Sequence, residues 1–417
     1  MHESELFDGI SSWLLERALT DGDLEETVTG LGRRLVGGGV PVFRINFGSL
    51  LLHPVLGALD LTWDALSDTC RSQAAPRAAA KTPEFQNAPF FQMVKNNVPF
   101  ERHRLDDPKV RAQYPLFETL GEMGITDYVA LFASYGRKTP MTWADLPAGV
   151  EGAVASFSTK RSGGFTDADV DNIKSLLAPF ALAMKTASER SLAKTLLETY
   201  LGKISGAKVL DGLVDRGDGQ VIECCLWFSD MRRSTAMASE LDIDSYFAAI
   251  NDYFDCAAGA VLDHGGEVLK LIGDAVMAIF PFEEGSRPPV NMCQAAVMTA
   301  RDALARMADK NRNRAEQGLA EIEFGIGLHT GKVMYGNVGT AQRLDLTVTG
   351  SAANEVARLE GLCKHLAVPV IASEQFKAIY GENLVSLGRQ DAAGIDDGLL
   401  AFTLPDFGKA RLKAVEN

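Results

Sequence analysis

The chain has 417 residues, of which 41 are basic and 55 acidic, giving a formal net charge of −14. This length is too great for one ordinary hydrophobic core and predicts about two domains. The negative charge argues against non-specific binding to nucleic acid or to an anionic membrane, because both favour a basic face. A nucleotide substrate stays compatible with it, since a divalent metal ion can bridge carboxylates and phosphates.

The cysteines and the N-terminus bear on the cellular compartment. The six cysteines form no Cys-x-x-Cys pair, and a chain of this size folds without disulfides, so we interpret them as reduced thiols. The N-terminus carries Glu3, Glu5 and Asp8 where a signal peptide has basic residues and an apolar run. No apolar stretch approaches the roughly 20 residues of a membrane helix. We therefore expect a cytoplasmic protein that binds neither membrane nor nucleic acid.

Residues 1–185 are expected to form one α+β unit. A helical pattern of apolar residues covers 10–18, and strand-like runs cover 40–52, 128–132 and 152–157. Helices flank these strands at both ends, which is typical of a sensor fold.

A long helix is predicted to close this unit and to lead out of it. Thr166 and Asp169 form a variant of the capping box, with Asp in place of the usual Glu. Apolar residues then recur at helical spacing, and Pro179 is expected to bend the helix or to interrupt its hydrogen bonds. The pattern continues weakly into a helical linker and transducer element at 186–218. This linker either pairs with its copy in a dimer or packs as an amphipathic helix on its own domain.

The C-terminal part, residues 219–405, has a different order of elements. Apolar runs and periodicities predict strands at 221–228, 268–271, 276–280, 322–329, 333–338 and 368–372, and helices at 247–261, 295–307 and 354–363. Residues 272–275 are interpreted as a hairpin turn, and 330–332 as a break between two strands. The order β-α-β-β-α-β is that of a ferredoxin-like fold, so the predicted fold class is α+β.

Two acidic residues stand at strand ends of this predicted sheet. Asp230 follows the first strand and Asp274 lies in the hairpin turn. In a ferredoxin-like sheet the first strand lies beside that hairpin, so the two carboxylates can meet at one end of the sheet. They repel each other unless a cation lies between them, and Mg²⁺ prefers such oxygen ligands. Each acid alone is more often a turn or capping residue, and the pair fits either a metal site or a structural coincidence.

Three motifs carry a resemblance to a known family. They are FSDMRRST at 228–235, KLIGDAVMAIF at 270–280 and LTVTGSAANEVARLE at 346–360. Together they resemble the catalytic domain of class III adenylyl/guanylyl cyclases, over roughly residues 219–405. The resemblance implies the conversion of ATP to 3′,5′-cyclic AMP and pyrophosphate in a homodimer whose two sites are shared between the subunits.

The resemblance also implies roles for single residues. Asp230 and Asp274 match the metal-binding aspartates, with the backbone carbonyl of Met231 as a further ligand and two Mg²⁺ or Mn²⁺ ions in each site. Lys270 and Thr347 match the pair that reads adenine. A Lys donor and a hydroxyl acceptor suit the ring nitrogen and the amino group of adenine, whereas guanine favours a Glu.

Two further residues match the pair that stabilises the transition state. Asn354 and Arg358 lie four residues apart and so share one face of a helix. Asn354 is expected to orient the ribose, and Arg358 to neutralise charge on the α-phosphate. Each residue taken alone has an ordinary interpretation: Lys270 as a solvated strand lysine, Thr347 as a strand threonine, and Arg358 as a member of a surface ion pair.

The chain also departs from the family pattern. Arg232 and Arg233 stand where the family has a small Gly, so two cations either help to bind the triphosphate or face solvent. Two other functions stay open. One is a catalytically inactive nucleotide-binding signalling protein, and the other is a cyclase that prefers GTP or a pyrimidine nucleotide.

The N-terminal part resembles a different family. The segments at 51–63, 123–132 and 156–184 look like parts of a GAF-like sensor domain of the kind found ahead of bacterial adenylate cyclases. The resemblance implies a small-molecule ligand and regulation of the enzyme by this domain. Residues 199–212 resemble the short transducer element that precedes such cyclases. His53 and His103 are isolated and are interpreted as ordinary residues rather than haem ligands.

Overall fold

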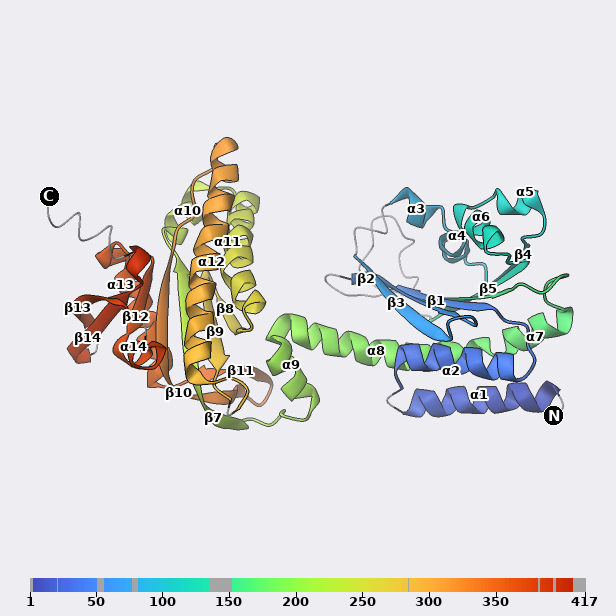
Figure 1. Cartoon of the computed structure of the whole chain (residues 1–417), viewed down its shortest axis with the longest axis horizontal. Helices are drawn as coiled ribbons and strands as arrows, with labels where there is room; N and C mark the ends of the chain where they lie inside the picture. The colour runs from blue at the N-terminus through green and yellow to red at the C-terminus, as the bar shows by residue number, and fades with distance from the viewer. Residues whose placement is uncertain are drawn as a thin grey trace. The chain divides into compact units, whose positions relative to one another are not determined.

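The computed structural model describes residues 3–20, 22–50, 56–76, 82–135, 152–283, 285–381, 383–392 and 395–407. The chain forms two compact units, Met1–Leu196 and Leu197–Asn417 (Figure 1). The end of the strand predicted at 40–52, and His53, lie outside the described residues. Among the described helices, none is both long enough and apolar enough to span a lipid bilayer.

The first unit is built on one antiparallel sheet of order β3-β2-β1-β6-β5-β4. Its strands are β1 (Arg44–Leu50), β2 (Leu56–Asp64), β3 (Thr69–Pro76), β4 (Phe100–Arg104), β5 (Asp127–Ser134) and β6 (Gly152–Thr159). Its helices are α1 (Glu3–Leu19), α2 (Leu24–Gly37), α3 (Pro83–Gln86), α4 (Pro89–Asn96), α5 (Pro108–Arg111), α6 (Pro115–Glu122), α7 (Asp167–Ser175) and α8 (Leu177–Leu201), the last of which runs on into the second unit. Strands β2, β3 and β4 were not predicted from the sequence.

The two faces of this sheet pack on different helices. Helices α1, α2 and α8 cover one face (Figure 1), where Leu14, Leu31 and Phe180 bury their side chains against Phe47 of the sheet. The other face packs on α4 and α6 through a second apolar cluster that includes Tyr128. Alternate residues of each strand thus enter different cores, as the two-residue period of a strand requires.

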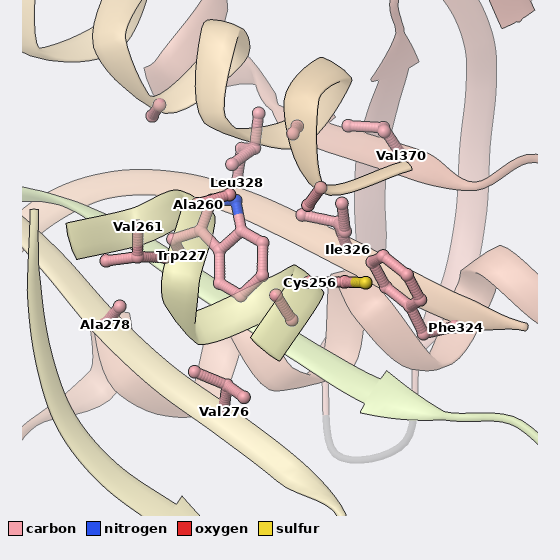
Figure 2. Packing of buried hydrophobic residues seen from close by; sticks show 14 of the residues in the cluster. Trp227, Cys256, Ala260, Val261, Val276, Ala278, Phe324, Ile326, Leu328 and Val370 are labelled. Carbon is pink, nitrogen blue, oxygen red and sulfur yellow. The ribbon is translucent and has the colours of Figure 1, made fainter. Parts of the chain in front are cut away.

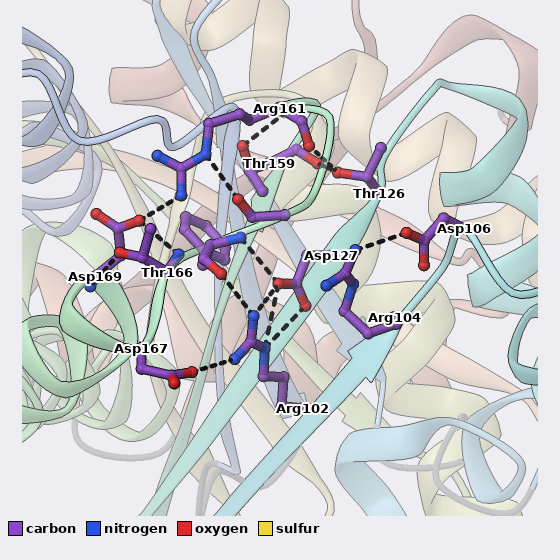
Figure 3. A network of polar contacts seen from close by, with 12 residues as sticks. Arg102, Arg104, Asp106, Thr126, Asp127, Thr159, Arg161, Thr166, Asp167 and Asp169 are labelled. Atoms are coloured by element: carbon purple, nitrogen blue, oxygen red, sulfur yellow. Dashed lines mark hydrogen bonds and ion pairs between the residues drawn. The ribbon is translucent and has the colours of Figure 1, made fainter.

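A polar network fixes β4 and β5 to the turn before α7 (Figure 3). The fully buried carboxylate of Asp127 accepts hydrogen bonds from the Arg102 guanidinium at 2.8 Å and from the Phe165 backbone N–H at 3.0 Å. Arg161 donates to Asp169 at 2.6 Å in the same network. A buried carboxylate is tolerated here because it is paired and hydrogen-bonded.

The predicted start and interruption of the long helix are confirmed. The Thr166 hydroxyl accepts from the Asp169 backbone N–H at 3.1 Å, and the Asp169 carboxylate accepts from the Thr166 N–H at 2.7 Å, which completes the capping box. Helix α7 ends at Ser175 and α8 begins at Leu177. Pro179 explains the interruption, because it has no N–H to donate to the Ser175 carbonyl and its ring crowds that carbonyl.

The second unit is built on an eight-stranded sheet of order β13-β14-β12-β10-β7-β9-β8, with β11 paired to β10. Its strands are β7 (Gly219–Met231), β8 (Glu267–Ile272), β9 (Ala275–Pro281), β10 (Phe324–Thr340), β11 (Arg343–Thr349), β12 (Val370–Ser373), β13 (Val385–Ala392) and β14 (Ile395–Thr403). Its helices are α9 (Lys203–Leu210), α10 (Ser234–Glu240), α11 (Ile243–Asp263), α12 (Pro289–Glu316), α13 (Ser351–Leu366) and α14 (Glu374–Tyr380). The central order β10-β7-β9-β8 is that of the predicted ferredoxin-like sheet.

The main core of this unit lies between the sheet and helices α11, α12 and α14. Trp227 of β7 is fully buried there, and it packs among residues of α11 and of the neighbouring strands β9 and β10 (Figure 2). The opposite face carries a smaller apolar cluster that joins β7 and β9 to β11 and α13. The ends of β7, β8 and β9 are therefore held from both sides, which fixes the loops that follow them.

One sequence prediction of strands is wrong. Residues 330–332 were expected to break a strand, but β10 runs through them and pairs there with Cys225, Cys224 and Glu223 of β7. The backbone groups of Thr330-Gly331-Lys332 are satisfied by this ladder, so the local preference of Gly for a turn is overridden by sheet pairing.

His329 on β10 is a buried histidine that stays neutral. Burial lowers the pKa of His329 from 6.5 to about 4, and Nδ1 lies 3.0 Å from the Ser373 hydroxyl. The Glu355 carboxylate is 3.8 Å from Nε2, beyond hydrogen-bonding distance, so it does not offset desolvation.

His329 is expected to make the protein sensitive to mild acid. The folded pKa lies below the unfolded one, so the unfolded state takes up the proton first and stability falls as the pH drops below 6.5 towards 4. Between pH 7 and pH 5 this amounts to about 2 kcal/mol. Urea unfolding of wild type and His329→Gln at both pH values measures it. The difference in the free energy of unfolding between the two proteins must change with pH. A constant difference would contradict the low pKa of His329.

Candidate active site

The two predicted metal aspartates meet at one end of the central strands. Asp230 is the penultimate residue of β7 and lies opposite Ala275 of β9. Asp274 sits in the turn between β8 and β9, where Gly273 adopts a φ of +64° that favours glycine. The Met231 backbone N–H donates to the Asp274 carbonyl at 3.2 Å and closes the turn onto β7.

The electrostatics of this pair are those of two carboxyl groups in contact. Burial, then the Asp274 charge and hydrogen-bonding contact with its carboxyl group, raise the pKa of Asp230 from 3.8 to about 6. Like charges held this close favour retention of a proton, or its replacement by a metal ion. A donor set of two carboxylates and the Met231 backbone carbonyl suits Mg²⁺ or Mn²⁺, which complete their shells with phosphate oxygens and water. Within the described ranges, no cluster of three or more His, Cys, Asp or Glu side chains has the arrangement of a metal site, so the pair needs such outside ligands.

A third carboxyl group, which sequence reasoning missed, lies beside this pair. Burial, then the charge of Asp230, raise the pKa of Glu360 of α13 to about 7, with Asp274 adding to the shift and Arg232 opposing it. Gly325 of β10 makes room for Glu360, since a Cβ at that position would lie 2.4 Å from Glu360 Oε1. The available signal was that Glu360 shares the sheet-facing side of α13 with the buried Val356.

The structure separates the two arginines that follow Asp230. The half-buried Arg232 guanidinium donates to the Val368 carbonyl at 3.2 Å and lies 3.8 Å from the Glu323 carboxylate. Arg233 is exposed, and its φ of +61° explains why a Gly is favoured at this position. Arg233 therefore faces solvent, and Arg232 bonds within its own unit.

The two predicted base-reading residues lie on neighbouring elements. Thr347 of β11 pairs with Gly336 of β10, and Lys270 lies on β8. Lys270 forms an ion pair with Asp345, two residues before Thr347 on β11. Asp345 and Thr347 share one face of the strand because Leu346, between them, is buried on the other. Sequence reasoning did not identify Asp345, whose partner is distant along the chain.

Asn354 and Arg358 lie on the side of α13 that faces away from the sheet. At about 100° per residue, they lie nearly opposite Val356 and Glu360, which face β10. In the part of the chain that the structure describes, neither side chain makes a hydrogen bond or an ion pair. A single chain thus brings Asp230 and Asp274 together but directs Asn354 and Arg358 elsewhere.

Comparisons with known proteins agree on the C-terminal part. Residues 219–381 match the family model described as the adenylate and guanylate cyclase catalytic domain. An adenylate cyclase of Anabaena cylindrica is 32% identical over 162 residues, which are 39% of this chain and 31% of that protein. Adenylate cyclase 1 of Rhizobium meliloti is 30% identical over 154 residues, which are 36% of this chain and 22% of that protein.

A solved structure of a bacterial light-regulated adenylyl cyclase is 26% identical and covers 58% of this chain and 66% of that one, with a TM-score of 0.45. The chain spans less than a third of the length of the two curated relatives. The family model places the similarity within the second unit, at residues 219–381.

Proposed function

We propose that the protein is an adenylate cyclase, because residues 219–381 match the model of the adenylate and guanylate cyclase catalytic domain. It converts ATP to 3′,5′-cyclic AMP and pyrophosphate. The observation that carries the proposal is the contact of the Asp230 and Asp274 carboxyl groups at the strand ends, in the same unit as the Lys270 and Thr347 pair.

The aspartates and Met231 are proposed to hold the divalent ions. Bound Mg²⁺ or Mn²⁺, two ions per site, would supply the positive charge that acidifies the ribose 3′ hydroxyl and neutralises the triphosphate. The 3′ oxygen attacks the α-phosphorus as its proton passes to water, and the bond between the α-phosphorus and the oxygen that bridges to the β-phosphate breaks. Pyrophosphate departs with that oxygen. Arg358 stabilises the charge on the α-phosphate, and Asn354 orients the ribose.

Lys270 and Thr347 are proposed to select adenine. The Lys270 ammonium donates to the adenine ring nitrogen, and the Thr347 hydroxyl accepts from the amino group. Asp345 holds the ammonium in place through the ion pair. Where adenine has a ring nitrogen that accepts, guanine has an N–H that donates. The Lys270 ammonium is also a donor, so it cannot form this hydrogen bond with guanine.

The site is proposed to be completed by a second copy of the chain. Asn354 and Arg358 face away from the sheet that carries their own metal aspartates, so they serve the aspartates of a partner. A two-fold homodimer then holds two equivalent sites. The exposed apolar residues Leu271 and Ile272, at the end of β8 beside Asp274, and Ile243 and Phe247, at the start of α11, fit such an interface.

We propose a sensor role for the first unit and keep the predicted limits of the domains: sensor 1–185, linker and transducer 186–218, and catalytic domain 219–405. The six-stranded antiparallel sheet with helices on both faces supports a GAF-like domain. Its small-molecule ligand would regulate the catalytic domain through the linker.

A single assay tests the proposed function. Purified full-length protein is incubated with ATP, GTP, CTP or UTP in the presence of Mg²⁺ or Mn²⁺, and the cyclic nucleotides are measured by mass spectrometry. Cyclic AMP as the main product supports the proposal. No product with either metal would favour an inactive nucleotide-binding protein, and cyclic GMP or a cyclic pyrimidine nucleotide as the main product would assign another substrate.

Asp345→Asn is expected to weaken the reading of adenine. It keeps the shape of the side chain but removes the charge that restrains Lys270. Because the ion pair is half-exposed, we expect the KM for ATP to rise about three- to fivefold with little change in kcat. The preference for ATP over GTP should fall with it. Asp309→Asn removes a comparable exposed partner of Arg312 and serves as the control, and an equal effect of both variants would contradict the role of Asp345.

A further inference from the structure

A buried polar cluster joins helix α9 to the catalytic sheet. Ser205 donates its backbone N–H to Glu267 Oε1 at 2.9 Å and its hydroxyl to the same oxygen at 2.7 Å. The Tyr335 hydroxyl lies 2.7 Å from Ser205 Oγ and 3.3 Å from Glu267 Oε1. The Tyr335 hydroxyl thus lies within hydrogen-bonding distance of both Ser205 Oγ and Glu267 Oε1. The three groups therefore form one hydrogen-bonded cluster around Glu267 Oε1.

This cluster is buried, and residues of α9 compensate the negative charge of Glu267. Ser205, Glu267 and Tyr335 are each at most 5% exposed, at 1%, 4% and 1%. Burial raises the pKa of Glu267, and the hydrogen bonds from Ser205 and Tyr335, together with the Lys208 charge, oppose that shift. Lys208 of α9 places its ammonium 4.3 Å from the centre of the Tyr335 ring. Helix α9 thus supplies both donors of Ser205 and a compensating positive charge.

The cluster lies on the two strands that carry the base-reading residues. Glu267 begins β8, the strand of Lys270. Tyr335 of β10 precedes Gly336, which pairs directly with Thr347 of β11. A displacement of Glu267 or Tyr335 therefore shifts the backbone on which Lys270 or Thr347 is mounted.

The chain on either side of α9 is held closely to the same strands. Gly202, with φ of +89°, precedes α9, and a Cβ there would lie 3.1 Å from the Val268 carbonyl oxygen of β8. Beyond α9, the Asn337 side chain of β10 donates to the carbonyls of Leu213 and Asp215 at 2.9 and 3.1 Å. The end of α8, helix α9 and the following turn thus form one strap across β8 and β10.

We propose that Ser205, Glu267 and Tyr335 are positioning residues for adenine recognition, through which the linker sets the place of Lys270 and Thr347. This inference rests on the proposed function. When α9 is seated, the Glu267 carboxylate is satisfied and β8 is held in the register that directs Lys270 to Asp345. When α9 lifts, a buried carboxylate loses its donors, which is costly. β8 must then move towards solvent, so a change in α8 reaches the base-reading pair.

Variants of the full-length protein that remove single members of the cluster test this role. Ser205→Ala and Tyr335→Phe are each expected to raise the KM for ATP about fivefold and to lower the preference for ATP over GTP, with kcat within about twofold. Glu267→Gln keeps an acceptor for Ser205 and is expected to restore much of the affinity that Glu267→Ala loses. Ser373→Ala is the control, because Ser373 is a buried hydroxyl with a hydrogen-bonded partner, His329, remote from α9.

The outcomes separate a positioning role from a structural one. A matched fall in melting temperature for Ser205→Ala and Ser373→Ala, with a rise in KM only for Ser205→Ala, supports the proposal. Equal KM values for wild type and Ser205→Ala overturn it.

Hydrogen exchange gives a readout that is independent of activity. Ser205→Ala is expected to speed amide exchange in 268–272 and 343–349, and a change confined to α9 overturns the proposal. If the wild-type protein has no cyclase activity, the proposed function is refuted instead. The hydrogen-exchange result then still tests whether the strap positions β8 and β11.

Discussion

Asp274→Asn is expected to lower the rate of cyclic AMP formation by at least about 100-fold, because one of the two proposed metal carboxylates is lost. The amide keeps the size of the side chain, so the turn at Gly273 persists. The rate is measured with Mg²⁺ and with Mn²⁺ at saturating ATP. Asp302→Asn is the control, since Asp302 pairs with Arg306 on α12, away from the strand ends, and it should retain full activity. Substantial activity of Asp274→Asn with either metal would contradict the metal assignment.

The same substitution is expected to stabilise the metal-free protein. Burial, and then Asp274, raise the pKa of Asp230 to about 6 in the folded state, so its stabilising contribution is full below the unfolded pKa of 3.8 and is lost as the pH rises through 6. Removal of the Asp274 charge relieves part of that loss. With allowance for solvent screening of this half-exposed pair, we expect a gain of about 1 kcal/mol at pH 7.5.

Thermal unfolding at pH 5 and pH 7.5, with and without Mg²⁺, measures this gain. Mg²⁺ should raise the melting temperature of the wild type but not that of Asp274→Asn, because only the intact pair binds the ion. A variant that is less stable than the wild type at pH 7.5 without metal would argue that the two carboxyl groups do not repel each other.

A mixture of Asp230→Ala and Arg358→Ala proteins is expected to regain activity that neither has alone. If the sites are shared, a heterodimer carries one site with both lesions and one intact site. Random exchange of equal amounts gives half heterodimers, and so about a quarter of the wild-type sites. The activity is measured after subunit exchange, which is followed by fluorescence energy transfer between labelled subunits.

A second mixture provides the matched control for this experiment. Asp230→Ala and Asp274→Ala each damage the aspartate pair of their own chain, so no site of their heterodimer is intact and no activity returns. Equal recovery in both mixtures, or none in the first despite complete exchange, would show that Arg358 does not act on the aspartates of a partner.

The features that depend on a few neighbouring residues were predictable from the sequence. The capping box at Thr166, the interruption near Pro179 and the turn at Gly273 each depend on backbone chemistry within a few residues. The central β-α-β-β-α-β order in 219–405 also followed from apolar periodicity, whereas β11, β13, β14, α10 and α14 were not predicted. The strand break expected at 330–332 was wrong, because pairing with β7 outweighs the preference of a Thr-Gly-Lys segment for a turn.

The sequence by itself determined the resemblance to a cyclase catalytic domain and the candidate residues, because motif spacing preserves which residue types stand at strand ends and on one helix face. Only the tertiary structure decided what surrounds them. Glu360 beside the aspartates, Asp345 on Lys270 and the Ser205–Glu267–Tyr335 cluster all join segments far apart in the chain. Periodicity describes which residues are neighbours along one helix or strand. It does not say which charged groups of different elements are brought together when the strands pair and the side chains are buried. These contacts therefore follow from the fold alone.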